Sequence, residues 1–253
     1  ALTSGDYNVA VGQGALGANN TGSRNTAIGY TALYTNTTGE YNTASGREAL
    51  YTNSTGEYNT GIGYQALLAN TTAGYNTGIG QSALRTNTTG ANNTAVGTQA
   101  LYGNTTASFN CALGDGALYT NSTGANNVAV GRIALYNNTT ADNNTAVGYA
   151  ALTANTTGSE NTAVGQNSLQ ANTTASDNVG VGHSALEANT TGAGLTAVGK
   201  NALKANTTGT RNIAIGFGAY DASDTENDNI AIGYEAMTTN TAGGTQNIAL
   251  GNY

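Results

Sequence analysis

Apolar and polar positions follow one pattern that repeats along almost the whole chain. The repeat occurs fifteen times, starting at Asn8, and thirteen of the fourteen intervals are 17 residues, whereas the last, Asn229 to Asn247, is 18. We number its positions as columns 1 to 17, with the consensus N-T-A-V-G-x-x-A-L-x-x-N-T-T-G-x-x. Column 5 is Gly in every copy, and column 1 is Asn in every copy except Leu195. Each column therefore has a fixed structural place.

The residue types in the columns predict which positions lie inside. Columns 3, 4, 8 and 9 stay small or apolar, so we expect them to point inward, and columns 6, 7, 10, 16 and 17 hold the charged residues apart from Asp224 and Glu226. The segment N-[TVI]-[AG]-[VI]-G predicts a short strand, because β-branched residues favour extended backbone, and A-L-x predicts a second, shorter strand. Asn and Gly in N-T-T-G are typical of a turn.

A unit of strand, bend, strand and turn returns to its starting side. We therefore expect an all-β parallel β-solenoid, a β-roll of about fourteen 17-residue coils, in which identical residues stack on one another. The Asn residues of columns 1 and 12 would then form two amide ladders without any ligand. The residues assigned to this framework are Asn25, Asn42, Asn59, Asn36, Asn53, Asn70, Gly29, Gly46 and Gly63.

The repeat also suggests how the chain is organised. We expect residues 1–7 to be a partial leading coil, 8–216 a regular array, and 217–253 a degenerate end that caps the array or leads into another segment. In that last segment Tyr220 replaces the column 9 Leu and Ser223 replaces the column 12 Asn.

The core of a single coil is thin, because it holds little more than one Leu, one Val and two Ala. Column 2 is Thr, Val, Ile or Cys and is never charged, so it is the candidate for an apolar stripe that is buried between chains. A homo-oligomer with cyclic symmetry would cover this stripe. Cys111 lies in this column, where we expect a buried small residue.

The runs N-V-A-V-G at 8–12 and N-I-A-I-G at 212–216 and 229–233 resemble the S-x-A-[IV]-G repeats of YadA-like head domains in trimeric autotransporter adhesins. The longer N-T-A-V-G-x-x-A-L-x-x-N-T-T-G arrays are similar to those of phage tail-fibre and other bacterial surface proteins. The resemblance implies a left-handed solenoid, a homotrimer, and a place outside the cell, on a cell surface or a virion. The coils here are longer than those of the adhesin heads.

Composition narrows the function classes. Only 8% of the residues are charged, Pro and Trp are absent, and a single His and a single Cys occur, which argues against an enzyme and against metal or other cofactor sites. The net charge of -7 offers no footprint for nucleic acid, and no apolar run is long enough to insert in a membrane. His183, in an outward column, is expected to be solvated.

Tyr is the one residue type that suggests recognition. Most of the 15 Tyr occupy columns 6, 10 and 17, and an aromatic strip on a rigid surface suits a glycan or a host surface protein. The alternative is that the rings only cover the small Ala and Gly columns. The candidates for surface recognition are Tyr30, Tyr34, Tyr41, Tyr51, Tyr58 and Tyr64.

Other interpretations are weaker but remain distinct. An ice-binding or surface-binding solenoid would use stacked Thr arrays, although column 2 is not purely Thr. A solenoid enzyme such as a polysaccharide lyase would need its acids in the degenerate coil that carries Asp221, Asp224, Glu226 and Asp228. The G-x-G-x-x-G at 12–17 lacks the following helix of a dinucleotide site, and glycans on twelve stacked N-x-T sequons would collide.

Overall fold

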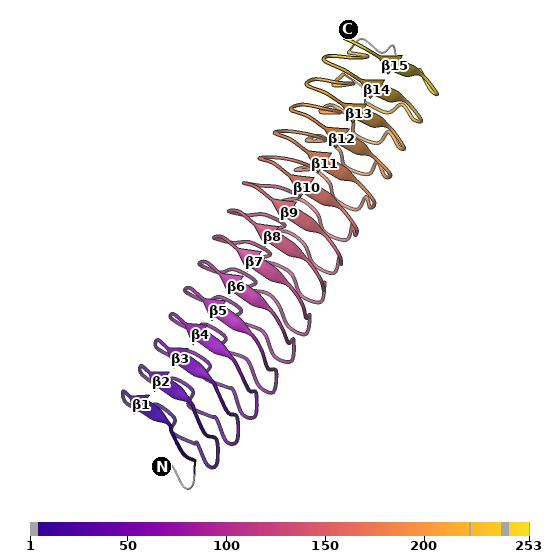
Figure 1. Ribbon diagram of the computed structural model, residues 1–253. Coiled ribbons are helices and arrows are strands. Elements are labelled where there is room, and N and C mark those ends of the chain that lie inside the picture. Colours follow the sequence, from indigo (N-terminus) through magenta and orange to yellow (C-terminus); the bar gives the residue numbers. More distant parts are fainter. Residues whose placement is uncertain (1–4, 223, 239–242, 253) are drawn as a thin grey trace. The chain divides into compact units, whose positions relative to one another are not determined.

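The computed structural model describes residues 5–222, 224–238 and 243–252. The chain is an all-β parallel β-solenoid of about 14 turns with about 17 residues per turn, as the repeat predicts. It divides into two compact units, Ala1–Asn126 and Asn127–Tyr253, and each is described by itself. In both units the strands follow one another in chain order (Figure 1).

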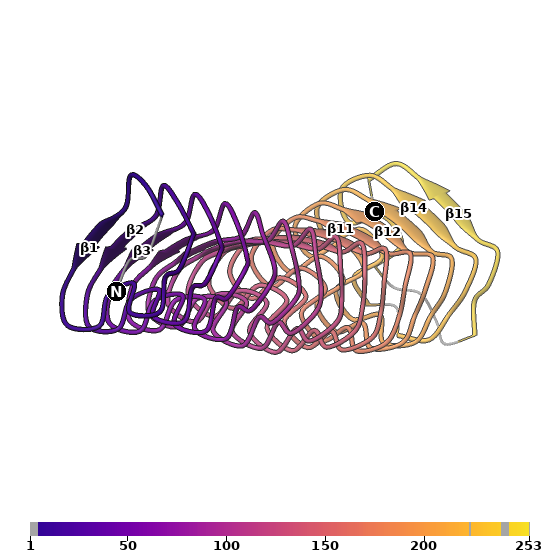
Figure 2. The same cartoon turned by 90° about the horizontal axis from the view of Figure 1, so that it is seen from below.

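Each strand is three residues long and occupies columns 2 to 4 of its coil. The described strands of the first unit are β1 (Val9–Val11), β2 (Thr26–Ile28), β3 (Thr43–Ser45), β4 (Thr60–Ile62), β5 (Thr77–Ile79), β6 (Thr94–Val96) and β7 (Cys111–Leu113). Those of the second unit are β8 (Val128–Val130), β9 (Thr145–Val147), β10 (Thr162–Val164), β11 (Val179–Val181), β12 (Thr196–Val198), β13 (Ile213–Ile215), β14 (Ile230–Ile232) and β15 (Ile248–Leu250). Within each unit the strands lie along one side of the coils, and the remainder of each coil closes the loop (Figure 2).

The strands pair in parallel and in exact column register. Thr26 lies opposite Thr43 and Ala27 opposite Ala44, and the same holds for β9 against β10, where Thr145 lies opposite Thr162. Register is fixed because a shift by one residue would turn the column 3 Ala out of the core. The predicted first strand and the stacking of identical residues are therefore confirmed.

The core consists of columns 3, 8 and 9, where Ala and Leu side chains such as Ala27, Ala32 and Leu33 are fully buried. The prediction that column 4 also points inward is wrong: Ile28 is 44% exposed and Ile215 is 39% exposed. Successive strand residues point to opposite faces, so a buried column 3 places columns 2 and 4 together on the outer face. Cys111, expected to be buried, lies on this outer face and is half-buried.

The predicted second strand at A-L-x is also wrong, because this segment is a turn. Residues at columns 7 and 9 adopt left-handed backbone, as in Thr31 (φ 49°) and Leu33 (φ 50°). The Thr31 N–H donates to Gln13 O of the preceding coil, whereas the Leu33 N–H donates to Ala49 O of the following coil. The segment thus bends sharply and still bonds to both neighbouring coils, which offsets the cost of left-handed backbone at non-Gly residues.

Two Asn ladders close each coil on its polar side. In column 1, the Asn42 N–H donates to Asn25 Oδ1 at 2.9 Å, and in column 12, Asn53 Nδ2 donates to Asn36 Oδ1 at 3.0 Å. Asn59 and Asn70 continue the same two ladders in the next coil. These Asn side chains are fully buried, so the predicted stacked Asn ladders are confirmed.

Where the structure describes Asn in both column 1 and column 12 of a coil, both ladders converge on one backbone carbonyl, in column 15. Gly56 O accepts Asn42 Nδ2 at 2.8 Å and Asn53 Nδ2 at 3.0 Å, which uses both of its lone pairs. In the second unit, Ala175 O accepts the Nδ2 groups of the corresponding column 1 and column 12 Asn. The two amides fix the N-T-T-G turn against the start of the strand.

The invariant Gly of column 5 has a steric cause. Gly29, Gly46 and Gly63 have φ between 127° and 139°, a conformation that residues with a side chain rarely adopt. A Cβ on Gly46 would lie 2.5 Å from Gly63 O. Any side chain in this column would therefore push neighbouring coils apart.

The ladders change toward the end of the chain. Leu195 is fully buried in column 1. Its backbone N–H still donates to Asn178 Oδ1 of the preceding coil at 2.9 Å, as an Asn N–H would. Tyr220 fills the column 9 Leu position inside the core, and its hydroxyl accepts Asn229 Nδ2 at 2.7 Å. The column 12 ladder ends at Asn206, whose Oδ1 has no partner.

The three segments expected from the sequence stay a prediction. Residues 1–4 of the leading segment, and residues 223, 239–242 and 253 of the last one, lie outside the described residues. Ser223, named above as a departure from column 12, is among them.

Removal of one ladder amide is expected to destabilise the solenoid. Asn138→Ala removes the hydrogen bond from Nδ2 to Ala141 O and the acceptor of Asn155 Nδ2, and should lower the free energy of unfolding by about 2–4 kcal/mol. The neighbouring Asn137 is exposed in column 11, so Asn137→Ala should cost less than about 0.5 kcal/mol. Urea unfolding of both variants measures the difference, and equal losses would contradict a structural role of the ladder.

A methyl group in column 5 should be far more harmful than one in column 3. Gly97→Ala adds a Cβ that lies 2.5 Å from Gly114 O at φ 137°, so we expect a loss of about 3 kcal/mol or more. Gly61→Ala restores the usual column 3 residue, with Leu50 Cγ nearest at 3.2 Å, and should change stability by less than about 1 kcal/mol. Thermal unfolding monitored by circular dichroism compares them, and a similar melting temperature for both would refute the steric account.

Candidate functional site

The turn after each strand presents columns 6 and 10 on the outside of the coil. Left-handed backbone at columns 7 and 9 turns the chain twice, so that the residues of columns 8 and 9 enter the core while those of columns 6 and 10 face outward. Column 17, also left-handed, forms a separate outer line. The prediction that the charged columns lie outside holds for columns 6, 10, 16 and 17, in which no described residue is buried. It is wrong for column 7, whose residues are half-buried or, as at Ser82, Ala150 and Ser184, buried. Glu226, which lies outside these five columns, is also buried.

The Tyr residues form stacks between neighbouring coils. In column 17, the rings of Tyr41, Tyr58 and Tyr75 stack with centroids 4.7 and 5.0 Å apart and interplanar angles of 6° and 8°. In column 10, Tyr34 and Tyr51 stack at 5.4 Å. The rings stack in parallel because the same column recurs in each coil, and neighbouring coils are separated by the distance between paired strands.

Column 6 contains a cation between two rings. The Arg47 guanidinium carbon lies 5.8 Å from the ring centroid of Tyr30 and 5.7 Å from that of Tyr64. Such contacts hold both rings and the guanidinium in place. The six predicted recognition residues are thus divided among three columns rather than gathered in one strip.

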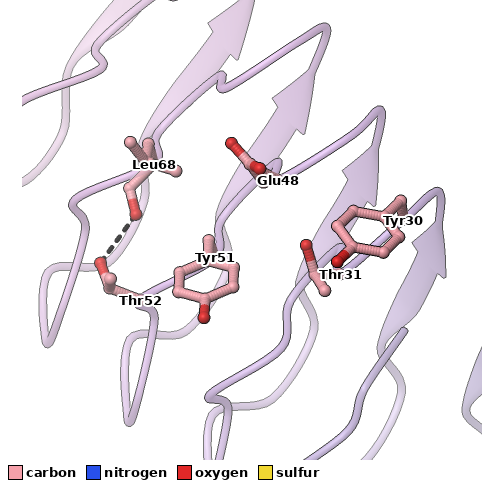
Figure 3. Close-up of a pocket in the computed structure, with 6 residues that line it drawn as sticks. All are labelled: Tyr30, Thr31, Glu48, Tyr51, Thr52 and Leu68. Atoms are coloured by element: carbon pink, nitrogen blue, oxygen red, sulfur yellow. Dashed lines mark hydrogen bonds between the residues drawn. The ribbon is translucent and has the colours of Figure 1, made fainter. Parts of the chain in front are cut away.

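A groove of about 440 Å³ runs between columns 6 and 10 of the first unit. We call it the tyrosine groove, and its lining residues are Tyr30, Thr31, Glu48, Tyr51, Thr52 and Leu68. Thr31 lies between the rings of Tyr30 and Tyr51, and Glu48 comes from the neighbouring coil (Figure 3). Of the six predicted Tyr, the groove brings together Tyr30 and Tyr51, whereas Tyr41 and Tyr58 lie in the separate column 17 stack.

The carboxylate in the groove is held by donors from two coils. Glu48 Oε2 accepts Gln65 Nε2 at 2.7 Å, and Glu48 Oε1 accepts Arg47 Nη2 at 3.0 Å. The Gln65 hydrogen bond and then the Arg47 guanidinium hold the pKa of Glu48 below its usual range, although partial burial opposes this. The network continues as Arg85 donates to Gln65 Oε1 and to the Tyr102 hydroxyl.

Four of the six groove residues were missed as recognition candidates in the sequence, and the polar floor residues Glu48 and Thr31 are the two that bear on binding. Glu48 is outward by its column, and Thr31 is ordinary, since column 7 varies freely. Thr31 Oγ1 is buried and has no hydrogen-bond partner. Only the turn geometry, which places columns 6, 7 and 10 of successive coils side by side, identifies them.

Some rings do cover small residues, as the alternative interpretation proposes. A Cβ on Gly17 would lie 2.6 Å from Tyr34 Cε2, so the Tyr34 ring packs closely over that glycine. In the column 17 stack, partial desolvation followed by the neighbouring Tyr41 and Tyr75 raises the pKa of Tyr58. The stacked rings therefore pack against other residues of the protein even where they are exposed to solvent.

The acids of the degenerate coil are engaged in structural bonds. Glu226 Oε2 accepts the N–H groups of Asp224 and Thr225, and its Oε1 accepts the Gly243 N–H, all at 3.2 Å. Asp228 forms an ion pair with Arg211. Burial raises the pKa of Asp221. No arrangement of nucleophile, base and orienting group is formed by these side chains.

The described residues form neither a metal-binding cluster nor a membrane-spanning helix. Within the described ranges, no three or more His, Cys, Asp or Glu side chains cluster so as to hold a metal ion. The part of the chain that the structure describes has no helix with the length and apolarity of a membrane span. His183 is exposed in column 6.

No protein-family model matches this sequence, and a comparison with curated proteins finds no significant match.

The buried carboxylate of Glu226 should make the stability of the second unit depend on pH. Burial opposes its ionisation, but the backbone N–H donors outweigh this and lower its pKa. A lowered folded-state pKa gives stability that is present above the ordinary carboxyl pKa and is lost as the pH falls through the folded value, that is, below about pH 4.3.

Glu226→Gln should therefore cost about 1–3 kcal/mol near pH 7 and progressively less toward about pH 3. Glu160 is exposed in column 17, so Glu160→Gln should change stability little at either pH. Urea unfolding at the two pH values tests this, and a loss for Glu226→Gln that does not shrink in acid would contradict the assignment.

Proposed function

We propose that the chain is a rigid segment of an extracellular fibre or adhesin, built as a homotrimer that projects from a cell or virion surface. Recognition, in this proposal, is carried by the outer columns and is directed at a glycan or a host surface protein. The chain has no catalytic role in the proposal. The observation that carries it is the exposed, uncharged face of the strands.

This strand face consists of columns 2 and 4, and none of the fifteen repeats has a charged residue in either column. Large apolar side chains remain exposed there, with Leu113 at 48%, Val164 at 36% and Ile232 at 39%. Every described coil except that of Thr43 and Ser45 has an apolar residue on this face, and such a repeated apolar surface is larger than a soluble monomer ordinarily exposes. We therefore expect it to be covered.

The occupant that fits best is another copy of this chain. Each coil presents two side chains on this face, one from column 2 and one from column 4, and the coils recur at the distance between paired strands. A partner must therefore repeat with the same period to match the face along the array. A second and third copy have that period by construction, and cyclic symmetry lets each copy cover its neighbour. The resemblance of the N-[VI]-A-[VI]-G segments to YadA-like head repeats supports the same arrangement.

The geometry also suits a rigid spacer. Within each unit, backbone hydrogen bonds join successive coils, and the Asn ladders add side-chain bonds between them. Such nearest-neighbour contacts make a solenoid long without a large core.

A second candidate function is binding of ice or of a crystal surface. Five successive coils of the first unit carry Thr in column 2, and these Thr lie in register on the outer strand face. They are Thr26, Thr43, Thr60, Thr77 and Thr94. An assay of ice recrystallisation distinguishes the two, since inhibition by a monomer would favour this candidate over the fibre.

The proposal predicts a molar mass three times that of the 25.2 kDa chain, measured by light scattering. Val164→Asp with Val198→Asp places charges on the strand face and should convert the trimer to smaller species, because charges are costly to bury. Gln166→Asp with His183→Asp adds the same charges to column 6, where both residues are exposed, and should leave the mass unchanged. A folded monomer for the unmodified chain would refute the assembly.

A further inference from the structure

The tyrosine groove has two aromatic walls that are already ordered. One wall is column 10, where Tyr51 stacks on Tyr34 at 5.4 Å, and the other is column 6, where Tyr30 contacts Arg47. Stacking between coils keeps each ring in place, so little side-chain entropy remains to be lost when a ligand binds. The groove therefore has one ordered Tyr ring on either side of a polar floor.

The floor is column 7, and its chemistry limits the class of ligand. The carboxylate of Glu48 already has Arg47 and Gln65 as donors, so its charge is largely compensated within the protein. A cationic ligand would have to compete with the Arg47 guanidinium. A neutral ligand with hydroxyl groups can donate to the remaining lone pairs of the carboxylate without disturbing that ion pair.

Thr31 adds a second polar group on the same floor. Its Oγ1 is buried without a partner, and an unpaired buried hydroxyl is unfavourable. After a rotation of the side chain, a hydroxyl-rich ligand in the groove would give this atom a partner. Thr52 Oγ1, at the rim, already donates to Leu68 O at 2.7 Å and can still accept.

We propose that the tyrosine groove binds a short neutral oligosaccharide, with sugar rings against Tyr30 and Tyr51 and sugar hydroxyls on Glu48 and Thr31. This inference rests on the proposed function, because it names the ligand class and the place of the recognition assigned to the outer columns. Aromatic faces pack against the apolar faces of sugar rings, and the few polar groups fix orientation, as in other small-molecule sites.

The combination of a carboxylate in column 7 with aromatic residues in columns 6 and 10 does not recur along the sequence. A carboxylate occupies column 7 in two coils, at Glu48 and Glu235, and only Glu48 has aromatic residues in both column 6 and column 10 of its neighbouring coils. Near Glu235 the column 10 residues are Asp221 and Thr238. The groove is thus a local feature that the repeat itself does not require.

The test is a titration of the full chain with cellohexaose, maltohexaose and a hexamer of N-acetylglucosamine, followed by NMR, with choline as a cationic probe. At least one sugar should bind. Tyr51→Ala and Glu48→Gln should each weaken that binding about tenfold or more. The matched controls Tyr58→Ala and Glu57→Gln alter exposed residues outside the groove and should leave affinity unchanged.

The outcomes separate this inference from the function on which it rests. Binding of choline alone, or sugar binding that is lost in Tyr58→Ala and kept in Tyr51→Ala, would overturn the groove assignment. A trimer that binds none of the three sugars would also overturn it while leaving the fibre proposal intact. Sugar binding in the groove by a monomer would support the inference and refute the fibre.

Discussion

The structure depends on one interaction, the joint hydrogen bonding of two buried Asn amides to a single backbone carbonyl in each coil from Asn25 to Asp177. Asn42 and Asn53 both donate to Gly56 O, and the same Asn residues are bonded to their counterparts in the preceding coil. The apolar core supplies only Ala and Leu from columns 3, 8 and 9, so burial alone would order this chain poorly. The amides close the polar half of each coil and also fix its register on the next.

The outer surface follows from that register. Because every coil repeats its neighbour, a side chain in an outer column lies directly over the same column in the next coil, and rings there stack. The left-handed residues of columns 7 and 9 then place columns 6 and 10 on either side of column 7. A repeat built for stability thereby creates walls and a floor, and substitutions in the variable columns of a few coils, such as Tyr51 and Glu48, make one stretch different from the rest.

Much of the fold could be predicted because the residue in each constant column is required by the backbone conformation or by a hydrogen bond at that position. Gly29 and its equivalents have a positive φ, and the ladder residues Asn25 and Asn36 are bonded as the stacking predicts. The second strand was wrong because a buried Leu33 is compatible with either extended or left-handed backbone, and residue type alone does not distinguish them at a non-Gly position. The prediction that column 4 is buried was wrong because it assumed that apolar residues lie inside. Side chains alternate along a strand, so Ile28 must lie on the same face as column 2.

The candidate site was predicted only in part, for a related reason. Tyr30 and Tyr51 were chosen as exposed aromatics, but they are separated by 21 positions and come together only through the turn and the coil spacing. Glu48 and Thr31 carry no signal in a variable column. A site assembled across coils therefore becomes visible once the backbone of the turn is known.

The most direct test of this account is hydrogen exchange of the Asn side-chain amides, measured by NMR in the intact chain. The ladder model predicts that the Nδ2 protons of columns 1 and 12, for example those of Asn42 and Asn53, exchange far more slowly than those of exposed Asn residues such as Asn137. Exchange of the ladder amides at the rate of exposed Asn would contradict the claim that they hold the coils together.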